Sequence, residues 1–414
     1  MLDQLTAVAE SAPGEGLPLE SARLARLAEL RRPVPLQAPA QHELDAIADS
    51  LFARLAVDFA AGRVNPATVD PDWHIIPTTP DVAGLERSAL SSGQVRATLM
   101  ALLPQHAEYR ALRDELARTL AEPAKTPGAA GFDRDARLSK LRAALERWRW
   151  MPHQLPAERI EVHVPEFHLV LMERDHVART HRVVVGKTVN KTPSFAAEIR
   201  GVIFNPYWDP PASIMSAELA PKFRRDPNFA AREGFVVFDT LGGPVDPAQA
   251  DWTRASTYHV RQRPGPANAL GRVKLDMPNP YAIYLHDTPA RNLFQRLKRT
   301  FSHGCIRVDQ ALTLAEILIG DAAWDSGLME SALSTNVETK VGLPKPLAIY
   351  VLYLTAGRAD DGTITYVDDV YGRDTRLINA LDDAGRLAIS SPSNGVGVAP
   401  APLKSVTARL LERL

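Results

Sequence analysis

A single cysteine lies in a short stretch whose residue types can carry out chemistry. Residues 302–308 read Ser-His-Gly-Cys-Ile-Arg-Val, and Cys305 is the one cysteine among 414 residues. A lone cysteine forms no intramolecular disulfide and excludes sites built from several cysteines. It is either an inert buried thiol or a nucleophile. Because cysteine is among the most buried residue types, the inert alternative is favoured until a base and a cation are found nearby.

Two histidines can supply the base that a catalytic cysteine needs, because a thiol with a pKa near ~8.5 is mostly protonated at neutral pH. His303 lies two residues before Cys305, and His286 lies 19 residues before it at the end of a predicted strand. If 284–286 and 304–308 are neighbouring strands joined by a helical segment over 291–299, His286 comes to lie beside Cys305. Alternatively, His286 is an ordinary strand-end histidine and His303 only shapes the turn.

Gly304 and Arg307 complete a set suited to acyl transfer. Gly304 allows close approach of the backbone to a substrate, and the amides of Gly304 and Cys305 could form an oxyanion hole. Two-residue periodicity places Arg307 on the same strand face as Cys305. There it could hold a substrate carboxylate and favour the thiolate, or merely pair with Asp287 or Asp309. The set indicates cysteine-dependent acyl transfer.

Composition excludes several other classes. With 48 basic and 49 acidic residues, the formal net charge is −1, so no global field recruits nucleic acid or an acidic membrane. The chain is 45% hydrophobic and 23% charged, which is typical of a globular protein of two or three domains. No run approaches the ~18 apolar residues of a membrane span. Near-absence of cysteine fits an oxidising compartment, and we expect any export signal to have been removed.

The first part of the chain has helical periodicity. Apolar residues recur at three- and four-residue steps over 24–30, 44–59 and 99–116. The Pro/Gly/Ala-rich residues that follow Glu122 favour a linker. Helicity resumes over 138–145 and ends before Pro152, which cannot continue a helix.

From residue 160 the apolar period changes to two. Alternation at 160–164, 169–171, 183–185 and 202–204 predicts antiparallel strands of a sheet that is wet on one side. The strand signal then fades until 282–286, which predicts an insertion that closes over the sheet. Asp309 is expected to cap a helix over 312–318, and residues 347–353 to form a central strand.

The two motifs, His286-Asp287-Thr288 and residues 302–308, resemble the signature of the L,D-transpeptidase (YkuD-type) family. Flanking motifs at 148–152, 184–187, 204–208, 261–266 and 268–274, with Trp73 and residues 371–374, resemble its YcbB-type branch. The resemblance implies an α+β fold. Its expected parts are a helical scaffold domain at 1–122, a linker at 123–136 in place of the branch's usual peptidoglycan-binding domain, a mostly antiparallel β catalytic domain at 137–375 with a capping subdomain at about 209–270, and a C-terminal tail at 376–414.

The family's pattern also implies roles for individual residues. Cys305 is the nucleophile and His286 the base, while His303 and Gly304 serve the oxyanion site. The predicted substrate-binding residues are Arg307, Ser302, Asp287, Tyr207, Trp208, Arg261 and Arg263. For Tyr207 and Trp208 the alternative is a core or lid position, and for the two loop arginines it is a solvated surface.

The implied reaction takes place on peptidoglycan stem peptides. Cys305 attacks the meso-diaminopimelate carbonyl of a donor tetrapeptide stem and releases D-alanine, and the diaminopimelate amine of an acceptor stem resolves the thioester. No metal and no cofactor is required. The resemblance further implies a periplasmic protein whose thiol reacts with carbapenems, and partners from cell-wall synthesis or wall binding. We expect a monomer that binds no nucleic acid.

Three alternatives stay open at this point. Water could resolve the same thioester, which would make the protein a carboxypeptidase, an endopeptidase or an amidase. A non-catalytic wall-binding scaffold could use the same groove. A redox-sensing thiol would need a resolving cysteine, and the chain has none.

Overall fold

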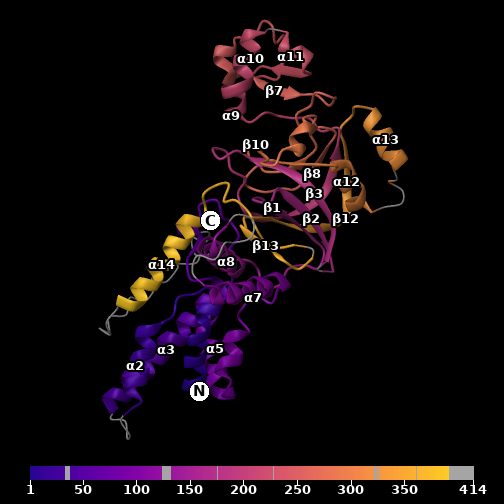
Figure 1. The fold of residues 1–414 in the computed structure, drawn as a ribbon. Coiled ribbons are helices and arrows are strands. Elements are labelled where there is room, and N and C mark those ends of the chain that lie inside the picture. The colour runs from indigo at the N-terminus through magenta and orange to yellow at the C-terminus, as the bar shows by residue number, and fades with distance from the viewer. Residues whose placement is uncertain are drawn as a thin grey trace, which may run out of the picture.

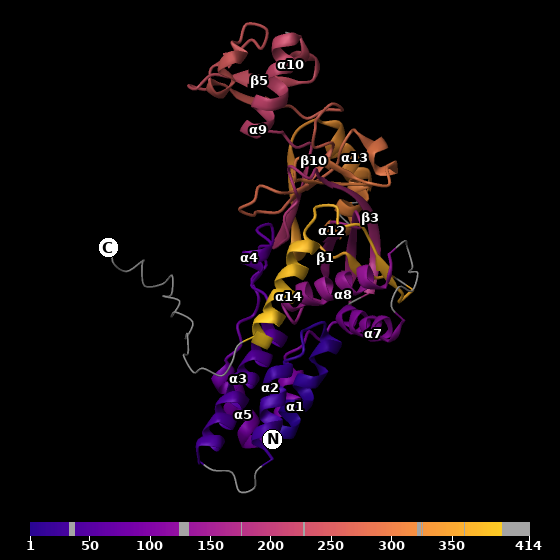
Figure 2. The same ribbon diagram turned by 60° about the vertical axis from the view of Figure 1, so that its left-hand side comes forward.

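Three bodies are stacked along the long axis of the molecule in the computed structural model (Figures 1 and 2). Helices that include the N-terminus lie at one end, a large sheet lies in the middle, and a small subdomain lies at the other end. The structure describes residues 1–32, 38–123, 132–174, 176–226, 228–320, 324, 326–359 and 361–390.

The helical body forms because leucines at three- and four-residue steps gather on one face of each helix. Leu27, Leu51 and Leu112 are fully buried in its core. The pattern expected as one helix over 99–116 is two helices, because the segment between them contains Pro104. The helices of this body are α1 (Leu2–Ser11), η1 (Ala12–Glu15), α2 (Ser21–Leu30), α3 (Ala38–Ala61), α4 (Pro66–Val69), α5 (Val82–Ser92), α6 (Val95–Met100) and α7 (Ala107–Ala121).

Helix α8 (Arg134–Arg149) joins the helical body to the sheet. The Asp133 carboxylate caps it by accepting a hydrogen bond from the Ala136 amide at 2.8 Å. Trp148 and Trp150 at its end are buried in one core with Leu352 of the sheet. The expected linker falls largely on residues 124–131, outside the described residues.

The expected C-terminal tail at 376–414 begins as a helix. Helix α14 (Asp374–Ser390) packs on α8, where Asp382 pairs with Arg142 at 2.8 Å and Leu377 and Leu381 enter the core. This helix returns the chain to the helical body, because it is amphipathic and has an apolar face to bury. Residues 391–414 of the tail lie outside the described residues.

The central sheet is mixed: most of its strand pairings are antiparallel, in line with the sequence-based expectation, but parallel pairings occur as well. Its order is β10-β3-β11-β9-β8-β4-β12-β1-β2, and a further β2–β3 pairing closes it on itself. Three pairings are parallel: β1 with β12, β3 with β10, and β9 with β11. Parallel neighbours are possible because long connections separate these strands in the chain. The strands are β1 (Arg159–His163), β2 (His168–Glu173), β3 (His176–Gly186), β4 (Phe195–Phe204), β8 (Val273–Asp276), β9 (Leu285–His286), β10 (Thr300–Ser302), β11 (Ile306–Val308) and β12 (Thr339–Leu352).

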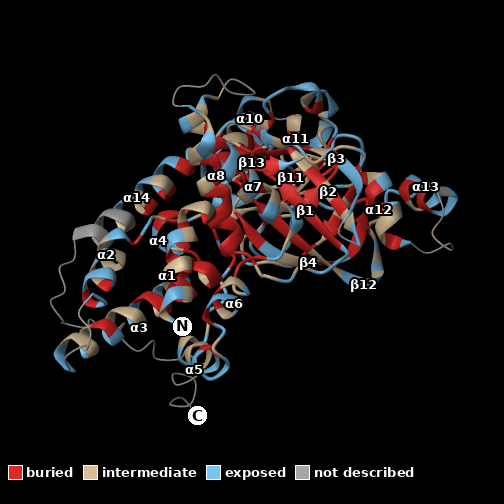
Figure 3. Ribbon diagram, turned by 60° about the horizontal axis from the view of Figure 1, so that its bottom comes forward, coloured by how far each residue is buried: buried red, intermediate tan, exposed pale blue. Residues whose placement is uncertain are grey.

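Burial of the sheet also departs from the one-sided wetting expected from sequence. Every residue of β1 is buried, and red ribbon fills the centre of the sheet in Figure 3. Residues 347–353 do form a central strand, since the end of β12 lies between β4 and β1. A two-stranded ribbon of β13 (Ala356–Arg358) and β14 (Ile364–Tyr366) follows it.

Helices beside the sheet are only partly as expected. The segment after β9 forms a short 3₁₀ turn, η5 (Arg291–Gln295), in place of a helix over 291–299. The predicted helix over 312–318 is α12 (Ala311–Ile319), and α13 (Ser326–Ser334) follows it. Asp309 does not cap α12, because Arg182 binds its carboxylate at 2.6 and 3.0 Å and Gln310 occupies the N-cap position.

Within residues 209–270 a compact subdomain has its own hydrophobic core. Phe223, Trp252 and Val260 are buried in that core, separately from the two larger ones. The subdomain consists of α9 (Ala212–Ile214), the π-helical turn η3 (Met215–Leu219), α10 (Ala220–Arg225), α11 (Phe229–Arg232), β5 (Phe235–Phe238), β6 (Pro244–Val245), η4 (Trp252–Thr257) and β7 (His259–Gln262). Among the described ranges, no helix has the length and apolar character to cross a bilayer.

A buried ion pair fastens the helical body to the sheet and yields a stability prediction. Arg373 binds Asp70 through Nε at 2.7 Å, and both side chains are 3% exposed. Arg373→Ala leaves the Asp70 carboxylate buried without its partner, so we expect the free energy of unfolding to fall by about 3–5 kcal/mol in urea denaturation. Asp70→Ala combined with Arg373→Ala should recover part of that loss. A loss below about 1 kcal/mol for the single variant would show that water reaches Asp70.

Candidate functional site

Cys305 lies in a tight loop between β10 and β11. The loop turns at Gly304, whose φ of 117° falls in a region that other residues rarely adopt. A Cβ built at this position would lie 3.0 Å from the Ile283 Cδ1 atom. Glycine is therefore required by the backbone that presents the thiol.

Two hydroxyl groups hold this loop in place. Ser302 Oγ donates to the Cys305 carbonyl oxygen at 2.6 Å and accepts from the Gly304 amide at 3.1 Å. Thr192 Oγ1 donates to the Gly304 carbonyl oxygen at 2.7 Å. Ser302 is 2% exposed, so it shapes the loop and does not meet a substrate as expected from sequence. The Gly304 amide is likewise already engaged, which removes it from the expected oxyanion hole.

The parallel pairing of β9 with β11 decides which residues face one another. Ile306 pairs with Leu285, and Arg307 pairs with His286. The two strands are neighbours, as expected, but continuing this register sets Tyr284 opposite Cys305. No hydrogen bond joins Cys305 to His286 within the described residues; the thiol lies 3.6 Å from the Ala282 carbonyl oxygen.

The thiol is half-buried in surroundings that keep it protonated. Burial raises the pKa of Cys305 above its ordinary value. The amide and the hydroxyl of Tyr284, with the charges of Lys274 and Arg307, act in the opposite direction. Burial also raises the pKa of Tyr284, so its hydroxyl stays protonated and able to donate.

His286 is buried and neutral. Its Nδ1 atom lies 2.5 Å from the Asp287 carbonyl oxygen, which can only accept, so this nitrogen carries a proton. Burial and the positive charges of Arg307 and Lys274 lower the pKa of His286 to about 3. Contacts with the backbone of Asp287 and Leu270 act to raise the pKa of the ring. The ring is 5% exposed.

Asp287 is a buried residue that holds the backbone next to His286 in place. Its carboxylate is 2% exposed, accepts from the Arg272 amide at 2.9 Å and pairs with Arg291 at 2.8 Å. Both oxygens thus have protein partners. In this structure Asp287 therefore serves as a support of the backbone, and its predicted contact with substrate would require these partners to be released.

His303 connects the cysteine loop to the subdomain at 209–270. Its Nε2 atom lies 2.7 Å from Oε1 of Glu218, which belongs to the π-helical turn η3. Sequence reasoning considered an oxyanion role or a local turn contact. The contact found is instead a long-range one between two bodies.

Arg307 forms no ion pair with any residue that the structure describes. Its Nε atom is buried without a hydrogen-bond partner, and burial lowers the pKa of the guanidinium. Neither carboxylate proposed for it is used, because Arg182 holds Asp309 and Arg291 holds Asp287. An uncompensated, half-buried guanidinium beside a thiol is suited to receive an anionic ligand.

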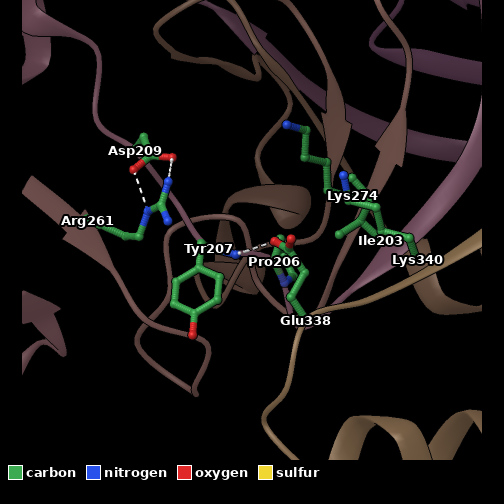
Figure 4. A pocket seen from close by; sticks show the side chains of 8 residues that line it. All are labelled: Ile203, Pro206, Tyr207, Asp209, Arg261, Lys274, Glu338 and Lys340. Carbon is green, nitrogen blue, oxygen red and sulfur yellow. Dashed lines mark hydrogen bonds and ion pairs between the residues drawn. The ribbon is translucent and has the colours of Figure 1, made fainter.

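A polar cleft of about 190 Å³ lies beside β8 (Figure 4). It is lined by Ile203, Pro206, Tyr207, Asp209, Arg261, Lys274, Glu338 and Lys340. Of the predicted substrate-binding residues, Tyr207 and Arg261 line this cleft, and Asp209 binds the guanidinium of Arg261 at 2.7 and 2.9 Å.

Two other predicted contacts lie apart from the cleft. Trp208 packs against the core of the subdomain, near Phe235, in agreement with the core alternative. The Arg263 side chain is exposed and does not line the cleft, in agreement with a solvated loop. No group of three or more His, Cys, Asp or Glu residues placed to hold a metal occurs among the described residues.

Sequence reasoning missed Tyr284, Lys274, Thr192 and Glu218. The sequence did contain a signal for Tyr284. It lies two residues before His286, just as Cys305 lies two residues before Arg307, and residues two apart in a strand share a face. Lys274 comes into place because it pairs with His286 across β8 and β9, with its ammonium 4.1 Å from the centre of the Tyr284 ring. Thr192 and Glu218 carry no signal in the sequence.

Comparisons with known families identify two parts of the chain. A family model described as the L,D-transpeptidase catalytic domain (YkuD) matches residues 157–337, and a scaffold-domain model matches residues 1–116. Residues 157–337 are thus similar to L,D-transpeptidase catalytic domains, and the helical residues 1–116 are similar to the scaffold domain.

Individual proteins match over part of their length. A Haemophilus influenzae protein provisionally named as an L,D-transpeptidase is 34% identical over 221 residues, which is 53% of this chain and 45% of that protein. The chain therefore spans about half the length of this curated relative.

Solved structures match weakly. An L,D-transpeptidase from Mycobacterium smegmatis is 11% identical with a TM-score of 0.22 and covers 47% of this chain and 58% of its own. A mutant Enterococcus faecium L,D-transpeptidase is 12% identical with a TM-score of 0.20 and covers 59% and 80%. The assignment of the catalytic domain rests on the family match and not on these scores.

The protonation state of the thiol gives a prediction. Because burial raises its pKa, alkylation of Cys305 by iodoacetamide should accelerate with pH and reach its midpoint above ~8.5. Lys274→Met removes an ammonium that lowers this pKa and should shift the midpoint further up. Lys345→Met, which changes an exposed lysine of β12, is the matched control. Intact-mass measurement follows the reaction, and a wild-type midpoint below 7 would contradict the assigned environment.

Proposed function

We propose that this protein is a peptidoglycan L,D-transpeptidase with Cys305 as nucleophile and His286 as base. The observation that carries the proposal is the β9–β11 register within the matched catalytic domain. It sets a half-buried thiol beside the Tyr284 hydroxyl and a neutral histidine beside an unpaired guanidinium. The flanking motifs further support the YcbB-type branch of the family.

In the first half-reaction a donor tetrapeptide stem acylates Cys305. The thiol proton passes to His286 Nε2 as sulfur attacks the diaminopimelate carbonyl, and the C–N bond to D-alanine then breaks. The departing amine takes the proton from His286. One C–S bond replaces one C–N bond, and free D-alanine leaves.

In the second half-reaction an acceptor stem resolves the thioester. The diaminopimelate side-chain amine of that stem attacks the carbonyl and loses its proton to His286. The C–S bond breaks, and the thiolate recovers the proton. The products are a cross-linked pair of stems and the free enzyme, with no net gain or loss of water.

The oxyanion of each tetrahedral intermediate needs donors that are not already engaged. The Gly304 amide donates to Ser302, so we assign this role to the Cys305 amide and the Tyr284 hydroxyl. The positive charge of Lys274 stabilises the same developing negative charge.

The pKa of His286 is low in the free protein, and a bound substrate can raise it. In the free protein the field of Arg307 opposes protonation of the ring. A substrate carboxylate bound to Arg307 offsets that charge, which raises the pKa of His286 and makes it a stronger base. Substrate binding and base activation are therefore coupled.

The subdomain at 209–270 is proposed to cap the site. Its link from Glu218 to His303 ties it to the residue before Gly304. A closed cap would keep water from the thioester and favour transfer over hydrolysis. Anchoring of the glycan falls to the scaffold, the cap or a partner protein. Because the substrate is peptidoglycan, we place the protein outside the cytoplasm, in the periplasm.

The reaction itself is tested with purified tetrapeptide muropeptides. Wild-type protein should form cross-linked dimers that mass spectrometry resolves, and Cys305→Ala should form none while keeping its thermal unfolding temperature. Tripeptide without dimer would mean that water resolves the thioester. Turnover by the alanine variant would overturn the assigned nucleophile.

Assignment of the base is tested by acylation rates. His286→Ala removes the proton acceptor and should slow acylation by about 10²–10⁴-fold, measured by the mass shift of the thioester. His303→Gln and Glu218→Gln each weaken the same contact with the cap and should give smaller losses that resemble one another. A larger loss for His303→Gln than for His286→Ala would show that the base is assigned wrongly.

A further inference from the structure

Strand register places a line of positive charges across one face of the sheet. Lys340 pairs with Ile203, Ile203 with Lys274, Lys274 with His286, and His286 with Arg307. Residues paired directly across strands have side chains on the same face. With strands ~4.8 Å apart, the three cations recur at intervals of about 10 Å along a line of about 20 Å.

The part of this line beyond His286 forms the floor of the polar cleft in Figure 4. Ile203, Lys274 and Lys340 all line the cleft, and Lys274 also lies over the Tyr284 ring. Tyr284 in turn lies opposite Cys305 when the register of β9 and β11 is continued by one residue. The cleft is thus continuous with the nucleophile through two neighbouring side chains.

Some charged side chains of the cleft are paired with one another and others are not. Arg261 and Asp209 neutralise each other in a bidentate pair. Neither Lys274 nor Lys340 forms an ion pair with any residue in the described ranges. Glu338 accepts one hydrogen bond, from the Tyr207 amide at 3.0 Å. Two free ammonium groups therefore stand beside a carboxylate that retains acceptor capacity.

We propose that this cleft binds the ammonium-carboxylate end of a diamino acid side chain in a stem peptide. The carboxylate lies between Lys274 and Lys340, and the ammonium faces Glu338. This inference rests on the proposed function and adds a specificity site to it: the side chain of diaminopimelate carries both groups, whereas that of lysine lacks the carboxylate.

The ligand also fits the spacing of the cation line. A stem peptide carries several carboxylates, and the line offers Arg307 on one side of His286 and the lysine pair on the other. A stem held at both points spans the nucleophile, which fixes the scissile carbonyl against Cys305. Lys274 and Lys340 then act as binding residues and take no proton in the reaction.

Binding is measured without turnover on the full chain carrying Cys305→Ala. Calorimetry compares three tetrapeptide stems, with diaminopimelate, its side-chain carboxamide or lysine at the third position. Adding Lys340→Met should raise the Kd for the diaminopimelate stem about fivefold and leave the other two within about twofold. Adding Lys345→Met on the same strand should change none of the three.

Two results would overturn the inference. One is equal binding of all three stems by the Cys305→Ala protein, and the other is unchanged discrimination after Lys340→Met. The proposed function is judged separately, by acylation of wild-type protein: an active enzyme that treats the three stems alike retains its function without this site.

Turnover by the Lys340→Met enzyme then distinguishes which stem occupies the cleft. A raised KM for acylation by the diaminopimelate stem assigns the cleft to the donor. An unchanged acylation step with slower resolution of the thioester by that stem assigns it to the acceptor. If neither step changes, binding at the cleft has no part in the reaction and the inference falls.

Discussion

The parallel pairing of two very short strands governs the chemistry of this protein. Strand β9 has only two residues and β11 only three, yet their register sets Tyr284 beside Cys305 and His286 beside Arg307. A slip by one residue would turn every one of these side chains to the opposite face. Strands this short do not hold a register alone, so the rest of the sheet must hold it for them.

The surroundings supply that support with buried polar contacts. Asp287, next to His286, is tied to Arg272 and Arg291, while Gly304 is fixed from both sides by Ser302 and Thr192. Asp287, Ser302 and Thr192 have protein partners and are buried, whereas the side chains of Arg272 and Arg291 reach the surface. The buried contacts keep the Cys305 thiol and the His286 ring in place, so these neighbours of the two side chains serve as supports.

In the free site the charge distribution favours a protonated thiol and a neutral histidine. The thiol is protonated because it is buried, and the histidine is neutral because it is buried between two cations. Negative charge placed beside Arg307 and Lys274 would raise the pKa of the His286 ring and make it a stronger base. It would also raise the pKa of the thiol, which these cations lower, so ionisation of Cys305 would depend on proton transfer to a base.

Sequence by itself predicted Cys305 and His286 as the reacting pair, and it determined most helices and strands, because these depend on local residue types and on periods of two or 3.6. It did not determine strand direction, since parallel and antiparallel strands share the same apolar alternation. Only the tertiary structure decided that Tyr284 faces Cys305 and that Lys340, Lys274 and Arg307 share one line. These cations come from strands far apart in the chain, and hydrogen bonding across the sheet brings them together.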